Sequence, residues 1–409
     1  MTVAATVATV ATGGSPTRRR LDSIDLLRGI VMVLMALDHT RDFALAATFQ
    51  FSPTDLSQTT TGIFLTRWIT HFCAPIFVLL AGTGSYLQLL RGKSAAELSR
   101  FLITRGLWLV VLEFTAVRTL WLFDFDYAHY LGMAQVIWAI GCSMFALGLL
   151  VRWLSPTTLG MIGLAIVSFH NLLDRFPSAF WIPGAVPRPS TLATIWKLLH
   201  GAGFTALGTS GPLLLTGYAL IPWFGVLLVG YGLGTVYSWE PEARRRFLLR
   251  AGVAAMIAFI AIRAVNRYGD PAPWSGPRVV LSFLNVTKYP PSLDFLLMTL
   301  GPALVALAVF DQVHIAPLVT FGRVPLFFYL LQWPATKGFT LIASLLAHKP
   351  TSYLFGQPPL NGPIPDGAGF SLPITYLIWI TVIVALYPLC AWYAGVKQRH
   401  REWWWLSYL

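Results

Sequence analysis

Ionisable side chains follow one face of the first strongly apolar segment, residues 24–45. Arg28 comes three residues after Asp25, and His39 comes eleven residues after Arg28. Because a helix turns about 100° per residue, Arg28 and His39 share a face and lie roughly 16 Å apart along its axis. Asp42, three residues beyond His39, could hold one ring nitrogen of the histidine and fix its tautomer. This arrangement suits a long, thin ligand with an anionic head and a distal reactive group.

Coenzyme A has that shape. Its phosphates would lie near Arg28, and its thioester would lie about one pantetheine length away, near His39. A neutral histidine is the usual group for removing a hydroxyl proton at neutral pH. A structural interpretation of the same residues is also open, with Asp25 and Arg28 as a helix-end ion pair and His39 as a packed, hydrogen-bonded side chain. If the segment spans a membrane, the cost of burying charge in lipid favours a functional role.

A second histidine lies where a proline interrupts the next apolar segment, residues 61–90. Pro75 has no N–H to donate in a helix, and the carbonyl that it leaves without a donor is that of His71. We therefore expect a kink that turns His71 into a cavity, where it would polarise a thioester carbonyl. A kink used only for packing is the alternative. Arg67, in the same segment, and Arg41, near the end of the first, are expected to bind the second substrate.

Three later residues complete the candidate site. Lys288 and Tyr289 end a long connection before an apolar segment, and they could bind an anionic or sugar group or anchor the loop at the membrane interface. Arg323 opens a further apolar segment, and we assign it to the same anionic head as Arg28. The chain's 3 cysteines stand alone in apolar stretches. Because they lack metal-ligand spacing, we expect neither a disulfide nor a metal site.

The elements that position these residues are predicted to be membrane helices. Of the 409 residues, 56% are hydrophobic and 11% are charged, whereas about a quarter would be charged in a soluble domain. A bilayer core needs roughly 20 apolar residues per helix. The sequence therefore predicts an all-α, polytopic integral membrane protein with about ten transmembrane helices, at residues 24–45, 61–90, 101–123, 132–151, 154–173, 212–238, 247–265, 293–310, 324–346 and 372–395.

The net charge of +12 comes from basic residues at the ends of these segments, which form no single stripe. Nucleic acid is therefore not an expected partner, and a positive-inside bias explains the charge. Placing Arg18–Arg20 in the cytoplasm brings the basic residues of 91–105, 244–250 and 397–401 to the same side. We therefore predict a multi-pass protein of the cell membrane with both termini in the cytoplasm. The long connections 174–211, 266–292 and 347–371 would then face outward.

The predicted organisation is a single membrane domain between two tails. Residues 1–20 form a disordered cytoplasmic tail, residues 21–396 the transmembrane domain, and residues 397–409 a second cytoplasmic tail. Membrane lipid is the expected environment of the domain. Assembly into a homo-oligomer is left open.

Several stretches resemble known membrane enzymes. Leu21–Ile30 and the apolar run to His39 resemble the opening of the transmembrane acyltransferases, and the Arg, ten residues, His spacing is similar to that of bacterial enzymes that O-acetylate surface sugars. The chain as a whole is similar to the heparan-alpha-glucosaminide N-acetyltransferase catalytic-domain family. The further stretches that carry this similarity are Thr70–Pro75, Thr287–Ser292 and Gly322–Tyr329. One departure is that residues 43–62 contain no histidine, whereas the lysosomal member carries its essential histidine in the loop after the first helix.

The resemblance implies a membrane acyltransferase that moves an acetyl or other acyl group from cytoplasmic acetyl-CoA (acyl-CoA) to a sugar or glycan outside. The expected residues are His39, Asp42 and His71 for catalysis, Asp25, Arg28 and Arg323 for the coenzyme, and Arg41, Arg67, Lys288 and Tyr289 for the acceptor. No metal is expected. The alternative is a transporter of a small solute or ion that uses the same polar residues, against which the missing internal repeat argues mildly.

Overall fold

The computed structural model describes residues 22–178, 181–208, 211–355, 364–400 and 402–407. Within this part of the chain, 6 helical stretches are long and apolar enough to cross a membrane: Thr61–Leu90, Pro156–Arg175, Leu220–Ser238, Pro241–Val265, Leu293–Gln312 and Leu372–Arg399. The predicted class, a helical membrane protein, is confirmed, while the count of ten transmembrane helices stays a prediction. The tail predicted over residues 1–20 lies outside the described residues.

The interruption predicted in the second apolar segment is present. Helix α1 (Asp22–Ala44) is followed by α2 (Thr61–Thr70) and α3 (Cys73–Leu90), so the break falls at His71 and Phe72. Pro75, in the first turn of α3, has no N–H to offer the His71 carbonyl. The break separates the shorter helix α2 from the longer α3.

The remaining helices occupy the other apolar segments. Helix α4 (Ala95–Leu112) passes through a π-helical turn, Glu113–Val117, into α5 (Arg118–Leu122). The other long helices are α6 (Val136–Leu150), α7 (Pro156–Phe169), α9 (Leu220–Leu233), α10 (Pro241–Val265), α12 (Leu293–Val309), α14 (Pro325–Leu346) and α15 (Leu372–Arg399). Three short helices lie in the connections: α8 (Thr191–His200), α11 (Val279–Leu284) and α13 (Ala316–Arg323).

A small sheet makes the all-α prediction incomplete. Strands β1 (Tyr130–Ala134), β2 (Gly203–Ala206) and β3 (Leu213–Thr216) pair in the order β1-β3-β2, with β1 parallel and β2 antiparallel to β3. Two predicted helices, over 132–151 and 212–238, therefore begin too early, because their first residues are strands. Pairing satisfies the backbone polar groups of these extended segments before α6 and α9 begin.

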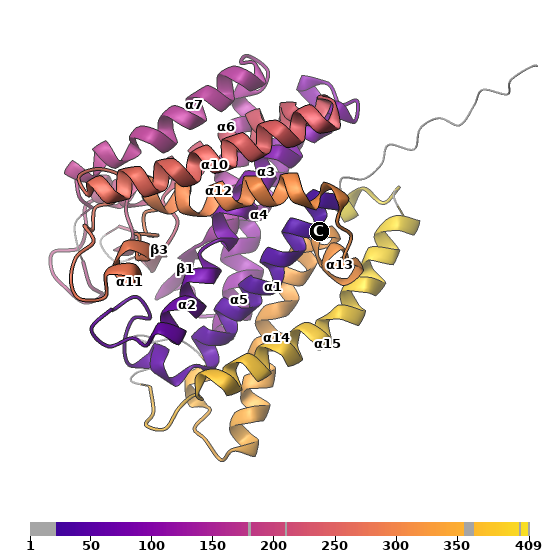
Figure 1. Ribbon diagram of the computed structural model, residues 1–409. Coiled ribbons are helices and arrows are strands. Elements are labelled where there is room, and N and C mark those ends of the chain that lie inside the picture. Colours follow the sequence, from indigo (N-terminus) through magenta and orange to yellow (C-terminus); the bar gives the residue numbers. More distant parts are fainter. Residues whose placement is uncertain (1–21, 179–180, 209–210, 356–363, 401, 408–409) are drawn as a thin grey trace, which may run out of the picture.

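Helix α1 lies at the centre of the fold, between α12 on one side and α14 and α15 on the other (Figure 1). Its contact with α13 depends on two glycines. A Cβ on Gly29 would lie 1.8 Å from the carbonyl oxygen of Leu318, and one on Gly322 would lie 1.8 Å from that of Asp25. No side chain fits at such distances, so the two backbones touch directly. This contact brings Arg323, at the end of α13, beside Asp25.

Candidate active site

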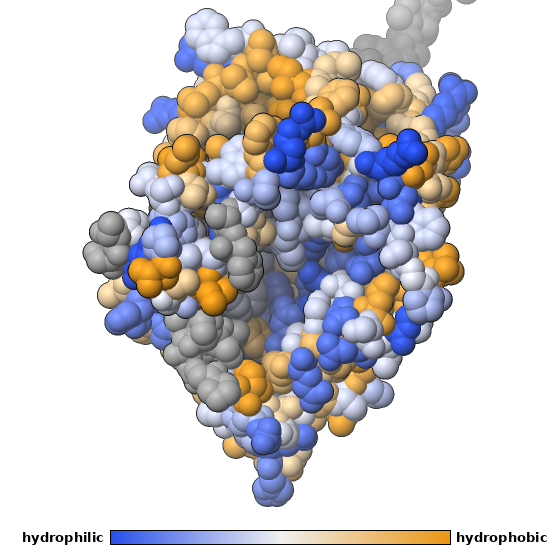
Figure 2. Space-filling view, turned by 90° about the vertical axis from the view of Figure 1, so that its left-hand side faces the viewer, coloured by the Kyte–Doolittle hydropathy of each residue, from blue (hydrophilic) through white to orange (hydrophobic). Residues whose placement is uncertain are grey.

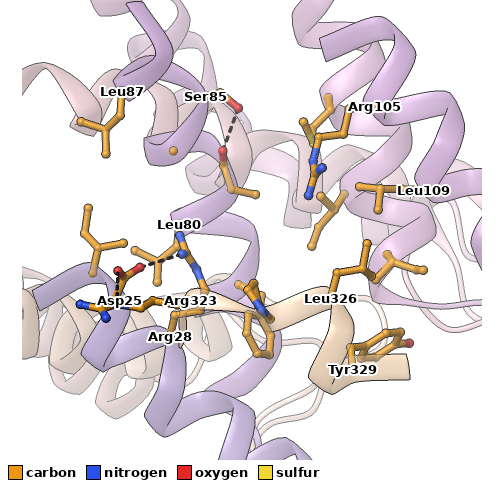
Figure 3. Close-up of a pocket in the computed structure, with 18 of the residues that line it drawn as sticks. Asp25, Arg28, Leu80, Ser85, Leu87, Arg105, Leu109, Arg323, Leu326 and Tyr329 are labelled. Carbon is orange, nitrogen blue, oxygen red and sulfur yellow. Dashed lines mark hydrogen bonds and ion pairs between the residues drawn. The ribbon is translucent and has the colours of Figure 1, made fainter. Parts of the chain in front are cut away.

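A cavity of about 370 Å³ lies among α1, α3, α4, α6 and α14. Asp25, Arg28 and Arg323, the three residues predicted to hold the coenzyme, all line it (Figure 3). Arg28 donates hydrogen bonds to the Asp25 carboxylate at 3.2 Å and to the Gly322 carbonyl at 3.3 Å. Arg323 Nε lies 3.9 Å from the same carboxylate. Tertiary structure therefore joins residues from α1 and α13 into one charged wall.

The cavity is strongly cationic at this end. Its basic lining residues are Arg28, Arg91, Arg105, Arg323 and Lys397. Figure 3 shows Arg105 on the wall that faces Arg28. Sequence analysis treated Arg91, Arg105 and Lys397 only as cytoplasmic charge and missed their part in a site. The position of Arg105 inside the start of an apolar segment was the one available signal, since charge there is costly.

Away from these charges the walls are apolar. Met32 and Met35 continue the Arg28 face of α1, and both line the cavity. Ile137 and Met144 of α6 and Leu109 of α4 complete the apolar part. His39 follows Met35 by about one helical turn on the same face. His39 itself does not line the cavity, and Met35 is the last residue of α1 that does.

His39 is held by α14. Its Nδ1 lies 2.5 Å from the Gln332 side-chain nitrogen, and its ring stacks on Trp333 with ring centroids 3.9 Å apart. The prediction that Asp42 holds this ring is wrong. Asp42 instead accepts a hydrogen bond from Arg41 at 2.6 Å, and its side chain is 44% exposed. A guanidinium offers a carboxylate a stronger, charge-assisted bond than a neutral imidazole does.

A polar cluster surrounds Asp38, the residue that precedes His39. The Asp38 carboxylate accepts from Arg67 Nη1 at 2.7 Å and 2.8 Å and from the Thr70 hydroxyl at 2.8 Å, and Arg41 Nη2 lies 2.9 Å away. Arg67 Nη2 also donates to the Tyr289 hydroxyl at 3.5 Å. Sequence analysis missed Asp38, although its position three residues before Arg41 was visible as a possible helical ion pair.

Lys288 completes this cluster from the loop before α12. Its ammonium lies 5.2 Å from the centre of the Tyr289 ring. Arg41 and Arg67 contact the Asp38 carboxylate directly, Tyr289 is linked to it through Arg67, and Lys288 contacts Tyr289. We call Asp38, Arg41, Arg67, Lys288 and Tyr289 the acceptor cluster, after the role predicted for the last four.

His71 does not take its predicted place in the cavity around Arg28. Its ring is 3% exposed and packs edge-on against Phe295, with centroids 5.5 Å apart, and it does not line the cavity around Arg28. It lies within electrostatic range of Arg67 and Lys288 instead. The proline break thus places His71 between α12 and the acceptor cluster. Among the described residues, no group of three or more His, Cys, Asp or Glu side chains could hold a metal ion.

The acceptor cluster is partly exposed at the molecular surface. Figure 2 views the side on which α2, α11 and β3 lie in Figure 1, and this face is hollowed near its centre among hydrophilic residues. Tyr289 is 40% exposed, whereas Arg41 is 4% exposed. The cluster therefore extends from the surface into the interior beside His39.

The fold and site define a helical membrane protein with a cationic cavity on one side of a histidine and a polar cluster on the other. A family model described as heparan-alpha-glucosaminide N-acetyltransferase, catalytic, matches residues 20–268. The chain belongs to this family of membrane acetyltransferases, which confirms the resemblance found in the sequence. The matched region contains Arg28, His39 and His71, while Lys288 and Arg323 lie beyond it. No curated protein matches the chain.

Proposed function

We propose that the protein transfers an acyl group, acetyl above all, from acyl-CoA on the cytoplasmic side to a hydroxyl or amine of a sugar or glycan on the outer side. The observation that carries this proposal is the cavity, with clustered cations at one end and an apolar course toward His39. Family membership supplies the reaction class. The donor, the acceptor and the sidedness are the parts that we propose.

The cavity suits coenzyme A because basic residues line one end of the cavity and apolar residues line the part that follows α1. The nucleotide end of the coenzyme is a compact polyanion, and arginines bind phosphate oxygens through paired, charge-assisted hydrogen bonds. Arg28, Arg105 and Arg323 would hold these phosphates, with Asp25 keeping Arg28 and Arg323 oriented. The pantetheine arm would then pass Met32 and Met35. The arm would present the thioester near His39, roughly 16 Å from Arg28 along the helix.

Acyl transfer requires a base that removes the proton of the acceptor and a route that returns this proton to the departing thiolate. Nε2 of His39 makes no hydrogen bond to any described residue, so it is available to the acceptor. Nε2 would take the proton of the acceptor hydroxyl or amine as that oxygen or nitrogen attacks the thioester carbonyl carbon. The carbon–sulfur bond then breaks, and the protonated histidine returns the proton to the departing thiolate. The acceptor cluster would orient the sugar, with Asp38 and Arg67 meeting its hydroxyl groups.

Binding of coenzyme A to the purified full-length protein tests the cavity assignment. Arg105→Ala and Arg323→Ala should each raise the Kd of coenzyme A about tenfold, or about 1.4 kcal/mol. Arg152→Ala, an exposed arginine outside the cavity, is the matched control and should leave the Kd unchanged. Failure of the wild-type protein to bind coenzyme A would favour the transporter alternative. Mass spectrometry of envelope glycans with and without the protein would identify the acceptor.

A further inference from the structure

The contact between Gln332 and His39 has no assigned role in the proposed reaction. Its side chain is fully buried on α14, and its amide nitrogen lies 2.5 Å from His39 Nδ1. The other amide atom, Oε1, is also buried and has no hydrogen-bond partner among the described residues. Trp333, the next residue, covers one face of the imidazole ring. Helix α14 therefore fixes the plane of the ring and contacts one of its two nitrogens.

We propose that Gln332 is a positioning residue that holds His39 in the tautomer with its proton on Nδ1. This inference rests on the proposed function, because only a base at Nε2 requires that tautomer. A neutral imidazole carries one proton, so Nε2 can accept a proton only when that proton is on Nδ1, and an acceptor that faces Nδ1–H stabilises this tautomer. Gln332 is the one described residue in hydrogen-bond contact with Nδ1. A half-turn of its amide would exchange the nitrogen that now faces Nδ1 for Oε1, which can serve as that acceptor.

The amide is able to present its oxygen to the ring. The oxygen and nitrogen of a glutamine amide have nearly the same shape, and only hydrogen-bond partners distinguish the two orientations. Because the far amide atom of Gln332 has no described partner, no second bond opposes the orientation in which Oε1 faces Nδ1. The same contact then persists through the reaction, since the imidazolium formed at Nε2 still donates from Nδ1–H to Oε1.

The charges around His39 explain why a neutral amide fills this place. Asp38 precedes His39 on α1, and Asp42 follows it by three residues. Both carboxylates are already bound to arginines, Asp38 to Arg41 and Arg67 and Asp42 to Arg41. Neither carboxylate is hydrogen-bonded to His39, and the residue that faces Nδ1 comes from α14. Gln332 supplies an acceptor for the Nδ1 proton without adding a buried charge.

Nitrogen NMR of the ring tests this assignment without any substrate. The full-length protein would carry ¹⁵N-labelled histidine, and the His39 signals would be identified by their loss in His39→Gln. We expect a proton on Nδ1 and none on Nε2 in the wild type and in Gln332→Glu, which keeps an oxygen acceptor. Gln332→Met, which keeps the side-chain volume but not the acceptor, should shift the ring toward the Nε2–H tautomer. Thr336→Val, one turn further along α14, is the matched control and should leave the signals unchanged.

The outcomes separate this inference from the acyl-transfer proposal. A wild-type ring protonated on Nε2, or the same tautomer in the wild type and Gln332→Met, would overturn the positioning role whatever the enzyme's activity. With acetyl-CoA as donor, Gln332→Met should lower kcat about tenfold or more, leave the KM for acetyl-CoA unchanged, and recover in Gln332→Glu. A lowered Tm with no change in tautomer would assign Gln332 to packing alone.

Discussion

At the scale of single residues, the proposed function assigns two tasks to one face of α1. Arg28 lies in the cationic mouth of the cavity, and His39 lies beyond its apolar part, stacked on Trp333. Interactions with the head of a ligand persist from the bound state to the transition state, whereas proton transfer occurs only in the transition state. The two residues should therefore contribute to different kinetic constants.

Replacing each residue by alanine checks this division. Arg28→Ala should mainly weaken coenzyme A binding, because it removes a cation from the phosphate end. His39→Ala should bind the coenzyme nearly as well as the wild type and lose turnover by about 10²–10⁴, the usual contribution of a general base. Calorimetry and single-turnover kinetics measure the two effects. Equal losses of binding in both variants would instead indicate a structural pair.

Asp38 should matter mainly for stability, because its carboxylate balances the charges of two arginines. Removing one member of a buried ion pair leaves an uncompensated charge and costs about 3–5 kcal/mol. Asp38→Asn should therefore lower the Tm markedly in detergent. Asp42→Asn, at a side chain that is 44% exposed, should change stability by less than about 1 kcal/mol. Similar Tm values for both variants would show that Asp38 is better solvated than the structure indicates.

At the scale of the elements, the cavity depends on how closely α1 and α13 approach. Asp25 and Arg28 lie on one helix and Arg323 on the other, and the backbone contact at Gly29 and Gly322 sets their separation. A side chain at either glycine must push the helices apart, because the nearest atoms belong to backbone rather than to a flexible side chain. Arg323 on α13 would then move away from Asp25 and Arg28 on α1.

Gly29→Ala tests this dependence. We expect a loss of about 1–3 kcal/mol in stability from overpacking, together with weaker coenzyme A binding. Gly338→Ala on α14, where an added Cβ meets nothing within 4 Å, is the matched control. It should keep or slightly raise the Tm, because alanine is the better helix former by about 1 kcal/mol. The Tm and the Kd of coenzyme A would be measured for both variants. Equal changes in the two variants would argue against the close contact between α1 and α13.

At the scale of the whole molecule, the cavity and the acceptor cluster lie at different depths along α1. The proposed reaction requires these two ends to face opposite sides of the membrane, with the basic mouth in the cytoplasm. The basic residues Arg91, Arg105 and Lys397 gather at that mouth, which agrees with the positive-inside bias.

The orientation of the termini checks this arrangement. Reporter fusions at residue 10 and residue 405 should both report the cytoplasm, because an even number of spans returns the chain to its starting side. Residue 10 lies outside the part of the chain that the structure describes, so the fusion supplies independent information. Reporters on opposite sides of the membrane would mean an odd number of spans and would invalidate the proposed sidedness.

The sequence by itself determined the class of protein and the local patterns of the site. Apolar segments of sufficient length required a membrane, the 3.6-residue period placed Arg28, Met32, Met35 and His39 on one face, and Pro75 located the helix break. The family was also recognisable from short stretches of sequence. All of these follow from properties of neighbouring residues, which the sequence shows directly.

Only the tertiary structure decided which partners meet. Gln332 binds His39 across 293 residues of chain, and Arg67 joins Asp38 from another helix. Asp42, which helical spacing favoured as the partner of His39, instead accepts a hydrogen bond from Arg41. His71 packs against Phe295. The sheet of β1, β2 and β3 likewise pairs segments that are separated by long connections. Such contacts depend on how helices pack and on competition among several partners, and neither is encoded in the spacing along a single segment.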